Sequence, residues 1–519
     1  MPEQFEAHSR TFALMTIVSR ISGLARDAVL GRIFGGGAIM SAFFFAFLIP
    51  NLFRRLFGEG ALAAAFLPAY ARLQQTDPAT AGRLATLTLG GLIGALGAVT
   101  LFGEGLLWMI WHYAPHQHLA VRLMMIMLPY MPLVCVVAIL GAISQVHGRF
   151  GPPSAAPIVL NIALIAAAVA FGACDPDSHI TAVAVAVLIA GVGQVMWMLW
   201  ALRPRRWLHL DCGTAGSDMR RVLTQAGPMI LGLGVLQLNT FLDGVIASYP
   251  VSIGPSIFGR PYPLDEGAMT FVSFAQRLYQ FPLGVFGLAV ATAIFPALAR
   301  HAGDDEAFAA LLRRGLRLSL FVGLPASCGL VLVGRPLAAV IFEGHLFTAA
   351  DSGRVAFVLL GYASAVWAYS LIHVLTRAFY AKGDSRRPVR VAVAMVGLNL
   401  ALNVTLIWTP LKEAGLAWST ATCATLQAAV LLWLVRRHTR RVLGGVLVSW
   451  LKTAVATGAM VASVLGVQAI GGRSGSWAAS LADLLVAVGV GVVIFSVVAR
   501  MLAMEELRWV IGRKNQVTK

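Results

Sequence analysis

The chain of 519 residues is 58% hydrophobic and only 12% charged, with a mean hydropathy of +0.78. Soluble domains carry about a quarter charged residues, so this composition excludes an ordinary soluble enzyme or a soluble nucleic-acid-binding domain. The net charge of +17 is instead typical of basic cytoplasmic loops in a polytopic membrane protein. The five cysteines are scattered without CxxC spacing, which argues against a disulfide framework or a thiolate metal site.

Apolar runs long enough to span a membrane recur along the whole chain and predict an all-α polytopic protein with about fourteen transmembrane helices. The second and eighth runs are too long for simple spans, and each contains prolines, so we expect kinks or breaks there. The predicted helices cover residues 11–34, 39–70, 84–111, 119–146, 154–173, 180–202, 218–248, 268–300, 312–333, 353–381, 388–408, 414–435, 444–469 and 478–503.

The connecting loops alternate between two sets, one far richer in arginine and lysine than the other. The basic set includes Arg72, Arg149 and the clusters at 203–206 and 436–441, whereas the 249–267 loop belongs to the other set. Cytoplasmic loops carry the excess of basic residues. This rule places both termini in the cytoplasm and the 249–267 loop on the outside.

The chain contains an internal repeat. Residues 63–72 read AAAFLPAYAR and residues 291–300 read ATAIFPALAR, a match at six of ten positions with an offset of 228. Six helices per copy give both copies the same orientation, which predicts a parallel repeat with a site at the interface of its two halves, as in transporters. The predicted parts are an N-lobe at 1–206, a C-lobe at 207–441, and helices 13 and 14 with a cytoplasmic tail at 442–519.

The residues most able to carry function are arginines inside the apolar helices. A cation at bilayer depth costs about 2.5–3.5 kcal/mol, so such residues usually face a wet cavity and an anionic ligand. Arginine suits phosphate groups because its planar fork binds two oxygens at once. We therefore predict a central cationic cavity whose substrate-binding residues are Arg20, Arg26, Arg54 and Arg277.

The first helix leaves an alternative open. Arg20 and Arg26 are six positions apart, which places them about 120° from a common helix face. Both could face the cavity if the helix bends between them. Alternatively, one of them could pair with Asp27 or extend to the membrane interface.

The second helix contains two adjacent arginines. Glu59 lies four residues after Arg55, so these two are predicted to form a gating or structural ion pair, a role also open to Asp27. Arg54 is then left for the ligand. Asp243 is a lone acid in the seventh helix and could be a coupling site for a cation or a salt-bridge partner, of which the salt bridge is favoured.

No catalytic motif, nucleotide-binding loop or metal-binding pattern stands out in the sequence. We therefore predict a transporter rather than an enzyme, with no catalytic residues, no cofactor and no metal. His112, His116 and His118 lie in a predicted outer loop and are expected to be solvated. Without a nucleotide-binding domain, an ion gradient or the membrane potential must supply the energy.

Long sequence runs carry a recognisable pattern: SRISGLARDAVLGRIFG, AFFFAFLIPNLFRRLFGEGALAAAFLPAYA and AQRLYQFPLGVFGLAVATAIFPALAR, with AFYAKGDSRRPVRVAV and LKEAGLAWS in support. These runs resemble the MurJ (MviN) family of bacterial lipid II flippases, within the multidrug/oligosaccharidyl-lipid/polysaccharide exporter superfamily. The resemblance covers nearly the whole chain, and the last two helices match in placement only.

The resemblance implies two six-helix lobes around a central cavity, with two C-terminal helices forming a groove for a lipid tail. It implies a protein of the bacterial inner membrane that moves lipid II, an undecaprenyl-pyrophosphate-linked disaccharide-pentapeptide, to the periplasmic leaflet by alternating access. The expected partners are lipid II, membrane lipids and cell-wall synthesis machinery, and not nucleic acid. The family's essential arginines map onto Arg20, Arg26, Arg54 and Arg277.

The chain also departs from the family pattern. Ser41 stands where an aspartate is frequent, Gln280 stands where an acid is common, and the 249–267 loop is longer than usual. These departures concern gating ion pairs and leave the arginine site intact. The alternative function is a related exporter of polysaccharide-lipid units or of cationic drugs on the same fold, although a drug exporter would need cavity acids.

Overall fold

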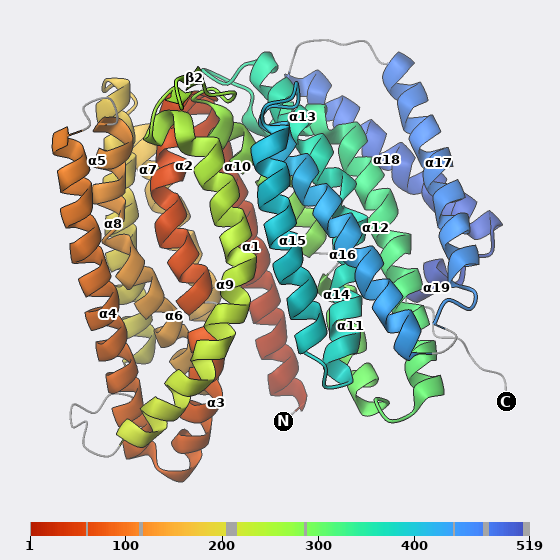
Figure 1. The fold of residues 1–519 in the computed structure, drawn as a ribbon, viewed down its shortest axis with the longest axis horizontal. Coiled ribbons are helices and arrows are strands. Elements are labelled where there is room, and N and C mark those ends of the chain that lie inside the picture. Colours follow the sequence, from red (N-terminus) through yellow and green to blue (C-terminus); the bar gives the residue numbers. More distant parts are fainter. Residues whose placement is uncertain are drawn as a thin grey trace. The chain divides into compact units, whose positions relative to one another are not determined.

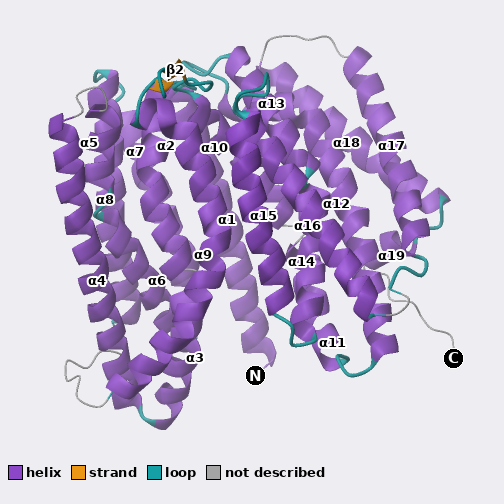
Figure 2. Ribbon diagram, viewed as in Figure 1, coloured by secondary structure: helices purple, strands orange, loops and turns teal. Residues whose placement is uncertain are grey.

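The computed structural model describes residues 2–58, 61–113, 118–203, 215–284, 288–439, 442–470 and 477–511. Nearly all of these residues are helical, as the apolar runs predict (Figure 2). The strands in this part of the chain form one short antiparallel hairpin, β1 (Ser256–Ile257) and β2 (Arg260–Pro261). The predicted all-α class is confirmed.

The first part of the chain follows the first six predicted helices. Some of these helices are continuous, whereas the second and fourth are divided into shorter segments. The elements are α1 (Pro2–Phe34), α2 (Ala38–Phe53), the π-helical turn η1 (Arg54–Gly58), α3 (Ala61–Thr76), α4 (Pro78–Tyr113), α5 (His118–Met127), α6 (Tyr130–Val146), α7 (Gly151–Ala170) and α8 (Pro176–Leu202).

The second part begins at α9 and is followed by three further helices. Its elements are α9 (Gly216–Ser252), α10 (Ala268–Pro282), α11 (Leu288–Arg300), α12 (Asp305–Phe342), α13 (Ala349–Ser364), α14 (Val366–Ala381), α15 (Arg386–Leu406) and α16 (Ala414–His438). The additional helices are α17 (Val446–Ile470), α18 (Trp477–Met501) and α19 (Glu505–Ile511).

Continuous and divided helices occur in the same order in both parts. In each part the second predicted helix is described as segments on either side of residues 59–60 or 285–287, and the later segment, α3 or α11, carries the sequence repeat. The fourth predicted helix of each part is divided as well, into α5 and α6 or into α13 and α14. The repeat seen in ten residues of sequence thus extends to the order of the helices.

The structure corrects the prediction that 119–146 and 353–381 are unbroken helices. Between α5 and α6 the chain passes through Pro129, whose ring nitrogen has no proton to donate to a helical hydrogen bond. Between α13 and α14 there is no proline. There the backbone N–H of Trp367 donates to Ser327 Oγ at 3.0 Å, which replaces a bond within the helix.

The two proline-containing helices depart from α-helical geometry near a proline. Pro50 lies inside α2, which continues into the π-helical turn η1. In the second part α10 ends at Pro282, and residues 283 and 284 are π-helical. Residues 59–60 and 285–287 lie outside the described residues, so the predicted breaks stay a prediction.

The chain divides by its contacts into two compact units. Unit 1 comprises Met1–Thr270 with Gly344–Phe347, and unit 2 comprises Phe271–Glu343 with Thr348–Lys519. In unit 1, α1 packs on α7, α7 packs on α8, and α9 packs on α2 and α3. In unit 2, α12 packs on α13, α14, α17 and α18. The predicted division into residues 1–206, 207–441 and 442–519 is based on the sequence repeat and not on contacts between residues. It stays a prediction.

Within unit 1, loops of the same predicted side gather at the same end. At one end the ring of Phe34, which ends α1, lies 4.5 Å from that of His179 near the start of α8. At the other end Arg72 pairs with Asp218 at 3.7 Å. Figure 1 shows α1 beginning at the lower end and β2 lying at the upper end. This grouping of loops agrees with the predicted alternation of basic and less basic loops. Which end of unit 1 faces the cytoplasm stays a prediction.

Eleven helical segments among the described residues are long and apolar enough to cross a membrane. The predicted helices at 11–34, 218–248 and 268–300 are not among them. The first carries several charges, including Arg26 and Asp27, and the third contains residues 285–287, which lie outside the described residues. The number of transmembrane helices, about fourteen by the spacing of the apolar runs, stays a prediction.

Candidate functional site

Arg26 lies in a buried polar cluster of unit 1 and is only 7% exposed. Its Nε and Nη2 atoms both donate to Asp27 Oδ1, at 2.9 and 2.6 Å. Its Nη1 atom donates to Asn161 Oδ1 of α7 at 3.0 Å. Pairing with Asp27 was one of the alternatives for the first helix, and it is the arrangement found here.

Asn161 ties this cluster to the packing of α1 on α7. Its Nδ2 atom donates to Ser22 Oγ at 2.9 Å, while its Oδ1 atom accepts from Arg26. The Asn161 side chain thus supplies both a donor and an acceptor to α1. Asn161 is not among the predicted site residues, although a lone asparagine inside an apolar helix is the signal that could have found it.

Arg20 lies on the same helix as Arg26 but is exposed. Among the described residues, no hydrogen bond or ion pair holds its guanidinium group. The two arginines of α1 therefore differ in environment, as expected from the 120° between their faces.

Arg54 begins the π-helical turn η1 and is half-buried. Its Nε and Nη2 atoms both donate to Asn51 Oδ1, at 3.1 and 2.8 Å. Its backbone N–H points to the carbonyl oxygens of both Asn51 and Pro50, at the end of α2. A cation is favoured at this position because the carboxyl end of a helix carries partial negative charge.

Arg55 links η1 to α9, since its Nη1 atom donates to Gln237 Oε1 at 3.2 Å. Gly234, about one turn earlier on α9, lies close to Leu56 of the same π-turn. The predicted partner of Arg55, Glu59, lies outside the described residues. The Arg55–Glu59 pair therefore stays a prediction.

Helix α6 connects the surroundings of Arg26 and Arg54. It packs on η1, which begins with Arg54, and on α7, which bears Asn161, a partner of Arg26. Tyr130 of α6 is 2% exposed and donates to Gln194 Oε1 at 3.2 Å, and Gln194 Nε2 donates to the Ala156 carbonyl oxygen at 2.9 Å. Arg26 and Arg54 thus both lie in unit 1, on elements that are joined through α6 and α7.

Asp243 lies on α9 in unit 1 and is 2% exposed. Gly244, the next residue, packs closely on α2, because a β-carbon there would lie 2.9 Å from Leu48 Cδ1. The structure thus places the acid where α9 meets α2. Its role, as a salt-bridge partner or as a coupling site, stays a prediction.

Ser41 is uncharged, and its side chain is fully buried and hydrogen-bonded. Its hydroxyl lies 2.9 Å from Thr270 Oγ1 and accepts from the Thr270 backbone N–H at 3.2 Å. A neutral hydroxyl pair therefore occupies the position where the family pattern has a frequent aspartate.

Arg277 belongs to unit 2, whereas the other three predicted arginines belong to unit 1. It is exposed on α10. The adjacent Gln276 donates through Nε2 to Tyr362 Oη at 3.0 Å, and Gln280 is half-buried about one turn later. That all four arginines share one site stays a prediction.

Unit 2 also contains a buried polar cluster that the sequence analysis did not single out. Asn403 Nδ2 donates to Asn399 Oδ1 at 2.9 Å, one turn apart on α15. From α16, Ser419 Oγ donates to Asn403 Oδ1, and Thr420 Oγ1 accepts from Asn399 Nδ2 at 3.4 Å. Two asparagines spaced by four in an apolar helix are the signal that could have found this cluster.

The described residues contain no group of three or more His, Cys, Asp or Glu side chains arranged to hold a metal ion. Of the three loop histidines, His116 lies outside the described residues. The ring of His118 stacks on Trp111 with a centroid distance of 4.4 Å. The absence of a metal or cofactor stays a prediction.

Repeated groups of apolar helices with embedded arginines define a polytopic membrane protein, and solved structures share its fold. A solved structure described as lipid II flippase MurJ in an inward closed conformation has this fold, with a TM-score of 0.76 and 20% identity over 95% of this chain and 99% of that chain. An inward-facing multidrug resistance transporter of the MATE family also shares it, with a TM-score of 0.66 and 13% identity over 83% and 98% of the two chains.

The family follows from the sequence comparisons. The family model described as "Lipid II flippase MurJ" matches residues 30–488. A probable lipid II flippase MurJ from Vibrio cholerae serotype O1 is 31% identical over 436 residues, which are 80% of this chain and 80% of that one. The chain belongs to the MurJ family of lipid II flippases, and it is a multi-pass protein of the inner membrane.

Proposed function

We propose that this protein flips lipid II from the cytoplasmic to the periplasmic leaflet and binds its pyrophosphate through arginines. Membership of the MurJ family supports the substrate. The observation that carries the site is the placement of two arginines in apolar helices of unit 1, where Arg26 is buried and Arg54 donates to the amide oxygen of Asn51. Arg20 and Arg277, which are both exposed, complete the proposed set.

The physical need for such a site lies in the head group. A disaccharide-pentapeptide with a pyrophosphate cannot cross hydrocarbon unaided, because each unpaired polar group buried there costs roughly 2–7 kcal/mol. Arginines replace water around the pyrophosphate while the polyprenyl tail stays in the lipid. Rocking of the two repeats then opens the site to one face and next to the other, without any covalent step.

The contacts support different roles for Arg54 and Arg26. Asn51 offers Arg54 a neutral oxygen, whereas pyrophosphate offers charged ones, and charge-assisted hydrogen bonds are about twice as strong. Pyrophosphate can therefore displace Asn51. Arg26 already holds the carboxylate of Asp27, which is harder to displace. Arg54 is accordingly the proposed first ligand, and Arg26 binds pyrophosphate when its pair with Asp27, the proposed gating residue, opens.

The orientation of the protein is part of the proposal. Both termini and the arginine-rich loops, such as the one at 436–441, lie in the cytoplasm because basic loops are retained there. The 249–267 loop, with the hairpin β1–β2, lies in the periplasm. The proposed partners, besides lipid II and membrane lipids, are the cell-wall enzymes that make and use lipid II.

Export of cationic drugs is the second candidate, because a multidrug transporter of the MATE family shares the fold. A cationic substrate needs accessible acids in the site. Among the described acids of unit 1, Asp27 lies on α1 and Asp243 lies on α9, which packs on η1. They are 1% and 2% exposed, and Asp27 is paired with Arg26. These observations favour an anionic substrate.

The test uses cells in which this protein is the only lipid II flippase. Its depletion should make lipid II accumulate in the cytoplasmic leaflet. Arg54→Ala should not restore growth, and Arg54→Lys should restore it poorly because an ammonium lacks the bidentate fork. Arg260→Ala, in the exposed hairpin, is the matched control and should grow normally. Normal growth of Arg54→Ala, with the protein present in the membrane, would contradict the proposed site.

A further inference from the structure

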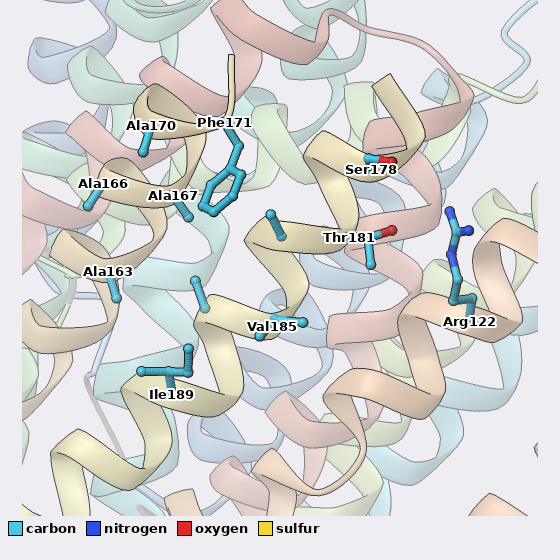
Figure 3. A pocket seen from close by; sticks show the side chains of 12 residues that line it. Arg122, Ala163, Ala166, Ala167, Ala170, Phe171, Ser178, Thr181, Val185 and Ile189 are labelled. Carbon is cyan, nitrogen blue, oxygen red and sulfur yellow. The ribbon is translucent and has the colours of Figure 1, made fainter. Parts of the chain in front are cut away.

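A groove of about 650 Å³ runs along unit 1 between α7 and α8. Figure 3 shows its two walls, with small side chains of α7 such as Ala163, Ala166 and Ala170 on one side. Val185 and Ile189 lie on the α8 side, and both are exposed. The walls are therefore apolar and accessible from the surface of the unit.

The groove has the length of one membrane leaflet. Its lining on α8 extends from Ser178 to Ile189, which is about 16 Å at a rise of 1.5 Å per residue. The hydrocarbon core of a bilayer is about 30 Å thick, so the groove reaches roughly to its midplane. Ser178 lies in the first turn of α8, where that span begins, so the polar end of the groove lies at the membrane interface.

The polar end carries one positive and one negative side chain side by side. Arg122 of α5 lines the groove, and its Nη2 atom donates to Asp177 Oδ2 at 3.4 Å and to the Asp177 carbonyl oxygen at 3.4 Å. The Nε atom of Arg122 is buried and has no hydrogen-bond partner within the described residues. The side chains of Arg122 and Asp177 remain 36% and 60% exposed, so both can bind a further group.

We propose that this groove binds a phospholipid with an ethanolamine head group. One acyl chain lies along the alanine wall of α7, the phosphate pairs with Arg122, and the ammonium group pairs with Asp177. Two adjacent opposite charges complement a zwitterion, whereas a purely anionic head group would be repelled by the Asp177 carboxylate. The exposed hydroxyl of Ser178 supplies one more hydrogen-bonding group. With the proposed orientation, this lipid belongs to the periplasmic leaflet.

The experiment compares two lipids on the full-length protein. Delipidated protein in detergent receives phosphatidylethanolamine or phosphatidylglycerol, and the bound lipid is counted by native mass spectrometry. The wild type should retain phosphatidylethanolamine preferentially. Arg122→Ala should weaken retention of both lipids about tenfold, because a charge-assisted contact is lost. Asp177→Asn should weaken retention of phosphatidylethanolamine and remove the preference.

Two substitutions on α7 separate the groove from general lipid contact. Ala166→Leu fills the groove and should lower retention, whereas Val169→Leu, which is exposed and not part of the lining, should not. Equal retention of the two lipids by the wild type, or a preference for phosphatidylglycerol, would overturn the proposal. Unchanged retention in Ala166→Leu would also overturn it. If Arg122→Ala does not fold, Asp177→Asn and Ala166→Leu decide the question.

Discussion

The guanidinium group of Arg54 donates two hydrogen bonds, at 3.1 and 2.8 Å, to the side-chain amide oxygen of Asn51, three residues earlier. This contact occurs where α2 passes into the π-helical turn η1. These two bonds orient a membrane-embedded cation through an uncharged amide, and a charged oxygen of pyrophosphate can compete with that amide.

The first prediction concerns the charge of that partner. In Asn51→Asp, a carboxylate would compete with pyrophosphate for Arg54 through a charge-assisted pair. We expect the affinity of purified protein for lipid II to fall about tenfold, and that of Asn51→Ala to stay within about threefold of wild type. Binding of fluorescent lipid II in detergent measures both. Wild-type affinity in Asn51→Asp would show that Arg54 does not contact the head group.

The second prediction concerns the pair of Arg26 and Asp27, whose side chains are 9% and 1% exposed. Asp27→Asn leaves Arg26 buried without its counter-charge, which should lower the free energy of unfolding by about 3 kcal/mol. The double variant Arg26→Gln/Asp27→Asn should recover most of that loss. Chemical denaturation of each variant in detergent gives the free energy of unfolding, and from these values the coupling free energy between Arg26 and Asp27. Additive effects of the two substitutions would refute a direct pair.

The third prediction concerns pH and the short helix α19. Glu506 is 1% exposed and accepts hydrogen bonds from Arg317 Nε at 2.6 Å and Ser449 Oγ at 2.5 Å. Burial acts to raise the pKa of this carboxyl, but the bonds from Arg317 and Ser449 outweigh it, so the pKa lies below its usual range. Its contribution to stability is present above the unfolded pKa of about 4.3 and is lost as the pH falls through the folded pKa.

Glu506→Gln measures this contribution. The difference in unfolding temperature between wild type and Glu506→Gln should be constant from about pH 8 to pH 5 and should shrink below about pH 4.3. Glu505→Gln is the control, because that side chain is 61% exposed and also contacts Arg317. A difference that grows on acidification would mean that Glu506 is protonated in the folded protein.

The fourth prediction concerns topology. Cys174 is exposed in the loop after α7 and lies on the predicted outer side. A variant in which Cys174 is the single cysteine should react with a membrane-impermeant thiol reagent in intact cells. A single cysteine at Arg436, exposed near the end of α16, should react only after the membrane is opened. The reverse pattern would invert the proposed orientation.

The helical class and the order of the helices could be predicted from the sequence, because membrane-spanning length and apolar composition are local properties. A departure from regular α-helix near Pro50 and Pro282 was equally readable, since proline removes a helical hydrogen bond. The break before Trp367 was not readable, because its cause is a hydrogen bond to Ser327, forty positions away in sequence.

The arginines could be chosen from the sequence, whereas their partners could not. Arg26 and Arg55 are conspicuous in apolar helices, but their contacts with Asn161 and Gln237 depend on how distant helices pack. Asp27 could be proposed as a partner because it is adjacent to Arg26. Polar residues that are uncharged, such as Asn161, cost less to embed than charges do and so attract less attention in a sequence.

The most direct test of the central claim is transport of lipid II by purified protein in proteoliposomes. Lipid II placed in one leaflet is followed by its accessibility to an impermeant enzyme that cleaves the exposed head group on the other face. Wild-type protein should move lipid II across, and Arg54→Ala, inserted equally well, should not. Transport by Arg54→Ala at the wild-type rate, or no transport by the wild type while an ethidium-like cation is carried, would contradict the account.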